Sequence, residues 1–109
     1  MATNTFKSNV AANIVTSGNT VYTVPAATQT TLIGLTLCNK STSTVTATVS
    51  LTRSAVNYQI ASNVSINSNT TSIIVGGSQK VVLQASDSLT ISASANASVD
   101  AVASLLEIA

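Results

Sequence analysis

Apolar residues alternate with hydroxyl-bearing residues along much of this chain, and residues 44–53 show the pattern most clearly. One set of alternate positions in this segment is apolar, and the other set holds threonine and serine. The apolar set is Val45, Ala47, Val49 and Leu51, and the polar set is Thr44, Thr46, Thr48, Ser50 and Thr52. A period of two places successive side chains on opposite faces of a strand. The segment is therefore predicted to be a β-strand with one face on a core and the other in water or at a polar contact.

Similar segments recur from residue 20 onward, and they are rich in the valine, isoleucine and threonine that favour strands. Strands are predicted at residues 20–24, 29–39, 44–53, 57–61, 71–75, 79–83, 88–93 and 99–107, with a short alternating piece at 64–66. Turn-forming residues such as Pro25 and the run Asn67-Ser68-Asn69 separate them. Many short strands at regular spacing predict an all-β domain over residues 20–109, an antiparallel β-sandwich or jelly roll of about eight strands.

Two of these segments carry more detailed predictions. In residues 29–39 the alternation assigns three apolar side chains to one face and three smaller ones to the other. The first set is Ile33, Leu35 and Leu37, and the second is Gly34, Thr36 and Cys38. The pair Gly76-Gly77 lies between two apolar runs, and glycine supplies the positive φ that tight hairpin turns need. Residues 71–75 and 79–83 are therefore predicted to form a hairpin.

Residues 1–19 are polar and weakly patterned, and they end in the turn signal Ser17-Gly18-Asn19. They are interpreted as an extended N-terminal arm outside the sandwich domain. Three alternatives stay open: a frayed terminus, an arm that lies on a neighbouring subunit, and a short amphipathic helix. The helix is suggested by Phe6, Val10 and Ile14, which are spaced four residues apart.

Charge is scarce in this sequence. The chain has 109 residues, only 6% of them charged, and a net charge of +1. Its cations are scattered at Lys7, Lys40, Arg53 and Lys80, which argues against a nucleic-acid partner or an anionic membrane surface. Aromatic residues are 3% of the chain and there is one cysteine. A small aliphatic core without an intrachain disulfide leaves oligomerisation as the expected source of additional stability.

Candidate chemistry is nearly absent. The sequence has no histidine, and its acidic residues are Asp87, Asp100 and Glu107. Asp87 is predicted to accept backbone hydrogen bonds in a turn. Asp100 is expected either to face solvent or to pair across a subunit boundary with Arg53 or Lys80. Glu107 is expected to be exposed or to serve as a charge on a sheet edge.

Cys38 is interpreted as a small buried hydrophobe. No catalytic, cofactor-binding or metal-ligating residue is predicted, and the chain is not expected to be an enzyme. Neither a secretory signal nor a membrane-spanning segment is recognised, so synthesis in a cytoplasm is expected.

Four segments resemble the small virion proteins of tailed bacteriophages. They are Val21-Tyr22-Thr23-Val24-Pro25, Ile33-Gly34-Leu35-Thr36-Leu37-Cys38-Asn39, Val75-Gly76-Gly77-Ser78-Gln79-Lys80-Val81-Val82-Leu83, and the closing stretch from Ser98-Val99-Asp100 to Leu105-Leu106-Glu107-Ile108. The resemblance covers roughly residues 20–108. It implies a virion component with a β-sandwich or jelly-roll fold, often trimeric, that decorates the head or forms part of the tail.

These observations favour a capsid decoration (cement) protein, assembled into the virion in the host cytoplasm. Its expected partners are itself, as a homotrimer, and the major capsid protein. A tail, neck or baseplate component is the alternative, and a carbohydrate-binding module that stacks sugars on Tyr22 or Tyr58 is a third hypothesis. The arm and the threonine-rich strand faces are the expected contacts. The candidate interface residues are Phe6, Val10, Ile14, Arg53, Lys80 and Asp100.

Overall fold

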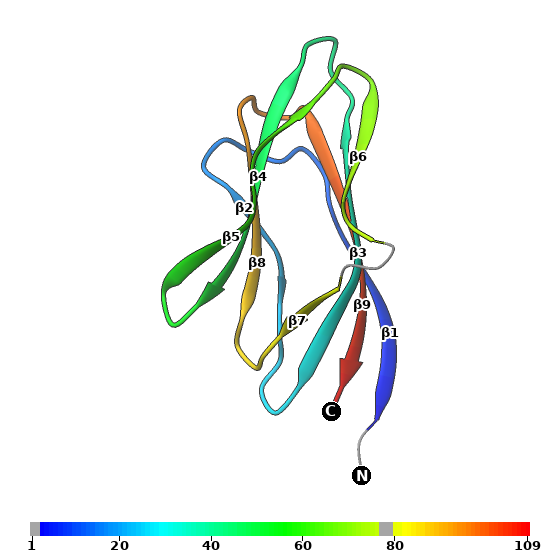
Figure 1. Cartoon of the computed structure of the whole chain (residues 1–109), viewed down its shortest axis with the longest axis vertical. Helices are drawn as coiled ribbons and strands as arrows, with labels where there is room; N and C mark the ends of the chain where they lie inside the picture. Colours follow the sequence, from blue (N-terminus) through cyan, green and yellow to red (C-terminus); the bar gives the residue numbers. More distant parts are fainter. Residues whose placement is uncertain (1–2, 77–79) are drawn as a thin grey trace.

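The computed structural model describes residues 3–76 and 80–109, which form two antiparallel β-sheets packed face to face (Figure 1). The described residues contain nine strands and no helix. The strands are β1 (Asn4–Ala11), β2 (Asn19–Thr23), β3 (Gln29–Asn39), β4 (Val45–Arg53), β5 (Val56–Ile66), β6 (Thr70–Val75), β7 (Val81–Leu83), β8 (Ser88–Ala93) and β9 (Val99–Ile108). The predicted β-sandwich is confirmed.

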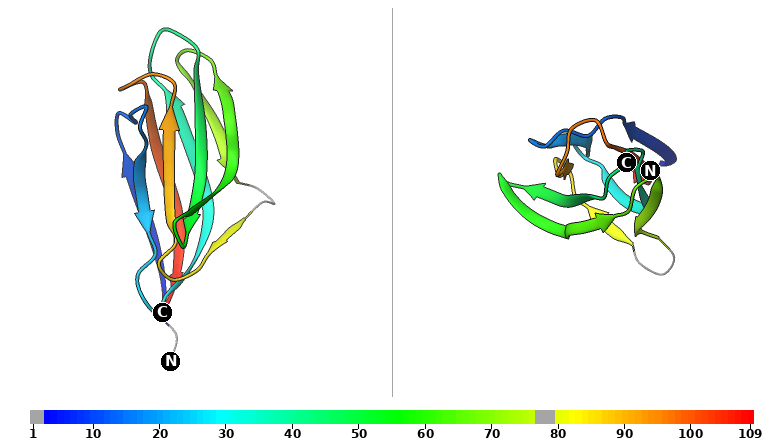
Figure 2. Two further views of the ribbon diagram at one scale, coloured as in Figure 1. Left: turned by 90° about the vertical axis from the view of Figure 1, so that its left-hand side faces the viewer. Right: turned by 90° about the horizontal axis from the view of Figure 1, so that it is seen from above.

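The two sheets differ in size and order. The five-stranded sheet runs β1-β9-β3-β6, with β7 also paired to β3, and the four-stranded sheet runs β2-β8-β4-β5. The sandwich is elongated, with extents of 49 × 28 × 22 Å (Figure 2). Thr3 and Ala109 lie at one pole of the sandwich, where their backbones hydrogen-bond to each other.

The hydrophobic core lies between the sheets and consists mainly of aliphatic side chains. On β4, Val45, Ala47 and Val49 are buried as their alternation predicts. Facing them from the five-stranded sheet are alternate residues of β3 and β9. The buried apolar residues of these two strands are Leu32, Leu35, Leu37, Val99, Ala101, Ala103 and Leu105.

The face assignment within β3 is corrected by a β-bulge. Leu32 pairs with Leu105 and Gly34 pairs with Ser104, so Ile33 is an extra residue on this strand. A bulge shifts the alternation by one position. Leu32 therefore joins the buried set on β3, whereas Ile33 is only partly buried.

The N-terminal segment is not a separate arm: residues 4–11 form β1, which pairs antiparallel with β9 along its whole length. The helical alternative is wrong. A spacing of four residues fits one face of a helix but also two periods of a strand, so Phe6 and Val10 share a face in either structure. Ile14 follows the strand and is fully buried in the core.

The predicted hairpin between β6 and β7 is also wrong. Both strands pair antiparallel with β3, β6 along residues 35–39 and β7 along residues 30–32. They therefore run in the same direction and follow one another along a single edge, whereas hairpin strands run in opposite directions. The three residues 77–79, which include Gly77 of the predicted turn, lie outside the described residues.

Strand β5 is one continuous element where the sequence suggested two pieces. Its pairing with β4 shifts register near Val49, and Asn63 adopts a positive φ of 49° there. Such irregularities let one strand continue through a local change of twist. The β4–β5 connection is a two-residue turn in which Ser54 and Ala55 both have positive φ, as hairpins of this length require.

Candidate interaction surface

The ionic groups are tied to one another within the chain, beginning with Asp87. This carboxylate is buried and accepts three hydrogen bonds from Arg53, the shortest 2.6 Å long. It also accepts the backbone N–H of Gln84 at 2.8 Å, which confirms its predicted role in a turn. The Arg53 guanidinium and this backbone bond lower the pKa of Asp87 against the effect of burial. Arg53 therefore serves to anchor the β4–β5 hairpin to the turn before β8.

Asp100 pairs with a cation that the sequence reasoning did not select. Its Oδ1 atom lies 3.1 Å from Lys40 Nζ and accepts the backbone N–H of Asn13 at 3.0 Å. These contacts, the backbone bond first, lower the pKa of Asp100. Within the chain the Arg53 guanidinium is bound to Asp87, and the pairing of Asp100 with Arg53 or Lys80 across a subunit boundary stays a prediction. Lys80 is exposed and immediately precedes β7.

Glu107 is neither exposed nor on an edge, since β9 lies between β1 and β3. Its side chain is 13% exposed and accepts hydrogen bonds from the Tyr22 hydroxyl and from Lys7 Nζ. The Tyr22 hydroxyl also contacts Thr30 Oγ1 at 2.9 Å. These bonds, that from Tyr22 first, lower the pKa of Glu107. Burial and the neighbouring carboxylate raise the pKa of Tyr22 to about 12. The cluster links the two sheets, since Tyr22 comes from β2 of the four-stranded sheet.

The outer face of the five-stranded sheet carries two apolar rows of side chains, because directly paired residues of neighbouring strands lie on the same face. The first row is Phe6, Leu106, Thr31 and Val82, and the second is Val10, Val102, Thr36 and Ile73. A middle row of small residues, Ser8, Ser104 and Gly34, separates them. We call these eleven residues the apolar face.

Exposure makes this face unusual. Phe6 is 78% exposed, Ile73 is 71% and Val10 is 70%. Among the described residues, seven large hydrophobic side chains are exposed, and five of them belong to the apolar face. Single exposed hydrophobic residues are normal, whereas a contiguous set marks an interaction site. The clustering identifies this face as the candidate interaction surface.

The six predicted interface residues are distributed unevenly around it. Phe6 and Val10 belong to the apolar face, and Asp100 lies on the same side of β9, one pair beyond Val102. Ile14 is 0% exposed and belongs to the core, and Arg53 is bound to Asp87. Lys80 is exposed two residues before Val82 and is the charged neighbour of the face at this end. The sequence reasoning overlooked Val82, Val102 and Ile73. Val102 had a usable signal, because apolar residues occupy both faces of β9.

The outer face of the four-stranded sheet is polar by contrast. One row across it consists of Thr20, Thr90, Ser50 and Gln59, and the next of Thr23, Ser88, Thr52 and Asn57. Neighbours in the second row bond to each other, Thr23 to Ser88 at 3.3 Å and Thr52 to Asn57 at 2.7 Å. These polar side chains are therefore partly satisfied within the sheet.

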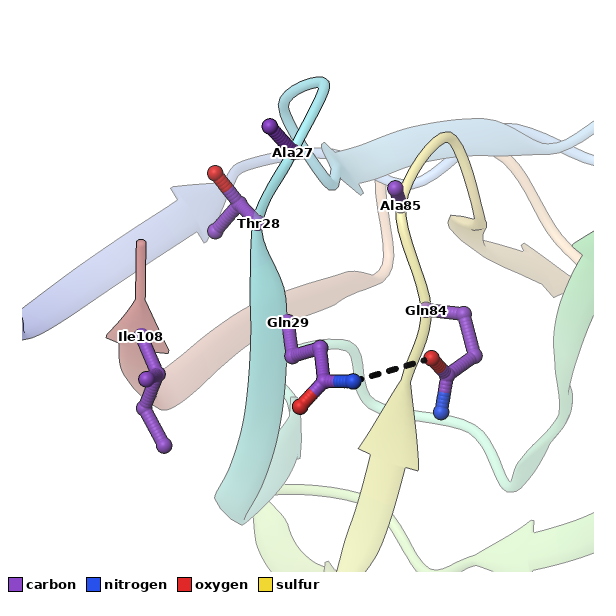
Figure 3. Close-up of a pocket in the computed structure, with 6 residues that line it drawn as sticks. All are labelled: Ala27, Thr28, Gln29, Gln84, Ala85 and Ile108. Atoms are coloured by element: carbon purple, nitrogen blue, oxygen red, sulfur yellow. Dashed lines mark hydrogen bonds between the residues drawn. The ribbon is translucent and has the colours of Figure 1, made fainter. Parts of the chain in front are cut away.

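A shallow depression of about 330 Å³ lies at one end of the sandwich (Figure 3). Its lining residues are Ala27, Thr28, Gln29, Gln84, Ala85 and Ile108. The two glutamine side chains bond to each other at 3.4 Å, and none of the lining residues is ionisable. The depression therefore offers no acid, base or nucleophile of the kind that catalysis requires.

Residues 3–76 and 80–109 contain no group of three or more side chains suited to hold a metal ion. The same residues include no helix of the length and hydropathy needed to cross a bilayer.

Comparison with known proteins gives a likeness in fold. No known protein family matches the sequence, and no curated protein matches it. One solved structure of similar shape comes from work on Bacillus endospore appendages, described as a novel family of disulfide-linked pili. The likeness covers 98% of this chain and 88% of that chain, with a TM-score of 0.54 and 13% sequence identity. At this identity the likeness shows a shared fold.

Proposed function

We propose that this protein is a structural subunit of a tailed-phage particle that decorates the capsid and binds both its own copies and the shell. The resemblance of four segments to small virion proteins supports the virion assignment. The apolar face is the single structural observation on which the binding role rests, because it leaves several large hydrophobic side chains in contact with water.

The mechanism is burial of apolar surface, repeated over many copies. Each square ångström of apolar surface removed from water contributes about 25 cal/mol. The binding free energy of one such contact is modest. A subunit that is held at several points on a lattice binds more tightly, because each contact raises the effective concentration for the next. The resemblance further implies a trimer, which uses a head-to-tail contact and therefore a second surface on each copy.

A tail, neck or baseplate position is the second candidate, since the resemblance includes tail components. Copy number separates the two, with hundreds of copies expected for a decoration protein and a dozen or fewer for a tail component. The carbohydrate-binding hypothesis loses support, because Tyr22 is buried and only Tyr58 of the two proposed stacking residues is exposed.

Particle association provides the test. Phage particles carrying the tagged protein would be separated on a density gradient, and the copies per particle counted by quantitative mass spectrometry. Val10→Lys places a charge on the apolar face, and Ser50→Lys places the same charge on the polar outer face of the other sheet. The proposal expects the first variant to be lost from the particles and the second to be retained. A protein absent from purified particles would overturn it.

A further inference from the structure

We propose that the apolar face binds the same face of a second copy of this chain, so that two copies pack sheet to sheet around a two-fold axis. The inference deepens the proposed function as an assembly subunit and rests on it. Three observations favour a second copy of this chain over a different protein as the partner of the apolar face.

The first observation is the electrostatics of the face. In a two-fold contact the same surface patch of both copies forms the interface, so any charge on the patch lies near the identical charge of the other copy. None of the eleven residues of the apolar face is charged. The nearest acidic group on that side of β9, Asp100, is already neutralised by Lys40 at 3.1 Å. The face can therefore meet itself without the repulsion that keeps most small proteins monomeric.

The second observation is the symmetry of the rows. The two apolar rows lie on either side of the small-residue row; both cross β1, β9 and β3, and the first ends on β7 and the second on β6. A half-turn about an axis along the small-residue row places one apolar row over the other. Phe6 of one copy then lies opposite Val10 of the next, and Val82 opposite Ile73. A large side chain thus meets a smaller one at β1, and hydrophobic residues meet at every exposed position.

The third observation is the size of the face. It is four strand positions wide, because β6 and β7 share one edge of β3, and its three rows span residues 6–10 of β1. A strand spacing near 4.8 Å and a row spacing of roughly 7 Å give roughly 400 Å² for each copy. The pair therefore buries roughly 800 Å², which is the size of weak or transient interfaces. We accordingly expect a weak association in solution, with a dissociation constant on the order of tens of micromolar.

Sedimentation equilibrium of the whole chain tests this inference. The monomer mass is 11.0 kDa. The wild-type protein is expected to form at least a dimer as its concentration rises from about 1 to about 100 μM, with dissociation constants in the range that such areas support. The double variant Val10→Lys/Ile73→Lys is expected to lose the two-fold contact and to sediment at a lower average mass than the wild type at the same concentration. Ser50→Lys, the matched control on the other outer face, is expected to behave as the wild type. Thermal unfolding of each variant verifies that it is folded.

Cross-linking locates the contact independently. In a Cys38→Ser background, Ser104→Cys places a thiol on the small-residue row, and Ser92→Cys places one on the opposite outer face. A bismaleimide whose span is about 10 Å, the spacing of packed sheets, is expected to join two copies through position 104 and not through position 92. Efficient linking only through position 92 overturns the inference, as does a wild-type protein that remains monomeric at about 100 μM.

The two proposals fail separately. A protein that is monomeric in solution yet bound to particles in high copy number overturns the self-contact and leaves the virion role standing. A protein that pairs through position 104 but is absent from particles overturns the virion role and leaves the self-contact standing.

Discussion

The two outer faces of the sandwich are built from the same kind of strand but carry different side chains. Across the four-stranded sheet, cross-strand rows consist of threonine, serine, asparagine and glutamine, some of them bonded to their neighbours. Across the five-stranded sheet the corresponding positions hold Phe6, Val10, Val102, Ile73 and Val82. Because a sandwich needs apolar residues only on its inner faces, the second set has no role in forming the fold. The contrast separates residues that specify the structure from residues that specify a contact.

Adjacent residues of β9 allow the sharpest test of this separation. Leu105 points into the core and is 1% exposed, while Leu106 points outward onto the apolar face. Leu105→Ala is expected to lower the free energy of unfolding by about 2–5 kcal/mol because it leaves a cavity. Leu106→Ala is expected to change the free energy of unfolding by less than about 1 kcal/mol and to weaken self-association severalfold. Denaturant unfolding and sedimentation measure the two quantities. Equal losses of stability would remove the distinction between the faces.

The hydrogen-bonded cluster around Tyr22 bridges the two sheets, and Tyr22→Phe tests its share of the stability. The variant loses the hydroxyl that bonds Glu107 and Thr30, at an expected cost of about 1–3 kcal/mol. The folded protein holds the Tyr22 proton more tightly than the unfolded chain, with a pKa near 12 against 10. This contribution is complete below pH 10 and is lost as the pH rises towards 12.

The exposed Tyr58 supplies the control for that experiment. Tyr58→Phe is expected to leave the unfolding free energy unchanged, because Tyr58 is 55% exposed. Chemical unfolding curves between pH 8 and 12 compare the three proteins. If Tyr22→Phe retained the full alkaline loss of stability, the bridge would not be its source.

Two carboxylates also differ in burial, since Asp87 is buried and Asp100 is only partly buried. Asp87→Asn disrupts an ion pair whose carboxylate is buried and a turn bond, and is expected to cost about 2 kcal/mol. Asp100→Asn affects a pair whose side chains are more than two-fifths exposed, and is expected to cost less than about 1 kcal/mol. Since the folded pKa of Asp87 lies below its ordinary value of 3.8, its contribution is present above that pH and is lost as the pH falls further. Acid unfolding that is unchanged in Asp87→Asn would contradict this account.

The smallest expected effect is that of salt on the dissociation constant of the self-contact. An interface formed by the apolar face contains no charge to screen, so raising the ionic strength from about 0.05 to 0.5 M is expected to change the dissociation constant less than about twofold. Sedimentation at the two salt concentrations measures it. A steep weakening would place the contact on charged residues instead and would remove the apolar face from the explanation.

Alternation along the sequence was sufficient to predict several strands and their buried faces. Strands β4 and β8 occur where the period of two predicts them, and Val45, Ala47 and Val49 are buried as expected. Alternation assigns side chains to the wrong face where one extra residue interrupts the period of two, as Ile33 does in β3. It also cannot say which strands pair. The segments that became β6 and β7 look like a hairpin locally, yet both pair with β3 because of contacts distant in sequence.

The candidate site was predicted only in part for the same reason. Phe6 and Val10 were selected from the N-terminal segment, but their position on a shared face depends on the pairing of β1 with β9. Ile73 and Val82 come from other strands, and only the register brings them into the same rows. The ion pair of Lys40 with Asp100 could not be predicted either. The two residues are sixty positions apart in the sequence, and the pairing of β3 with β9 brings them together.

The hydrogen-bonded ends of the chain have a practical consequence. Thr3 and Ala109 exchange two backbone hydrogen bonds, at 2.7 and 3.0 Å, so the first and last strands are held together at their free ends. A short glycine-rich linker could join them without disturbing the fold, and new ends could be opened in the exposed turn at Ser54 and Ala55. Such a circular permutant would move fused cargo to the tip of the β4–β5 hairpin while leaving the core residues in place.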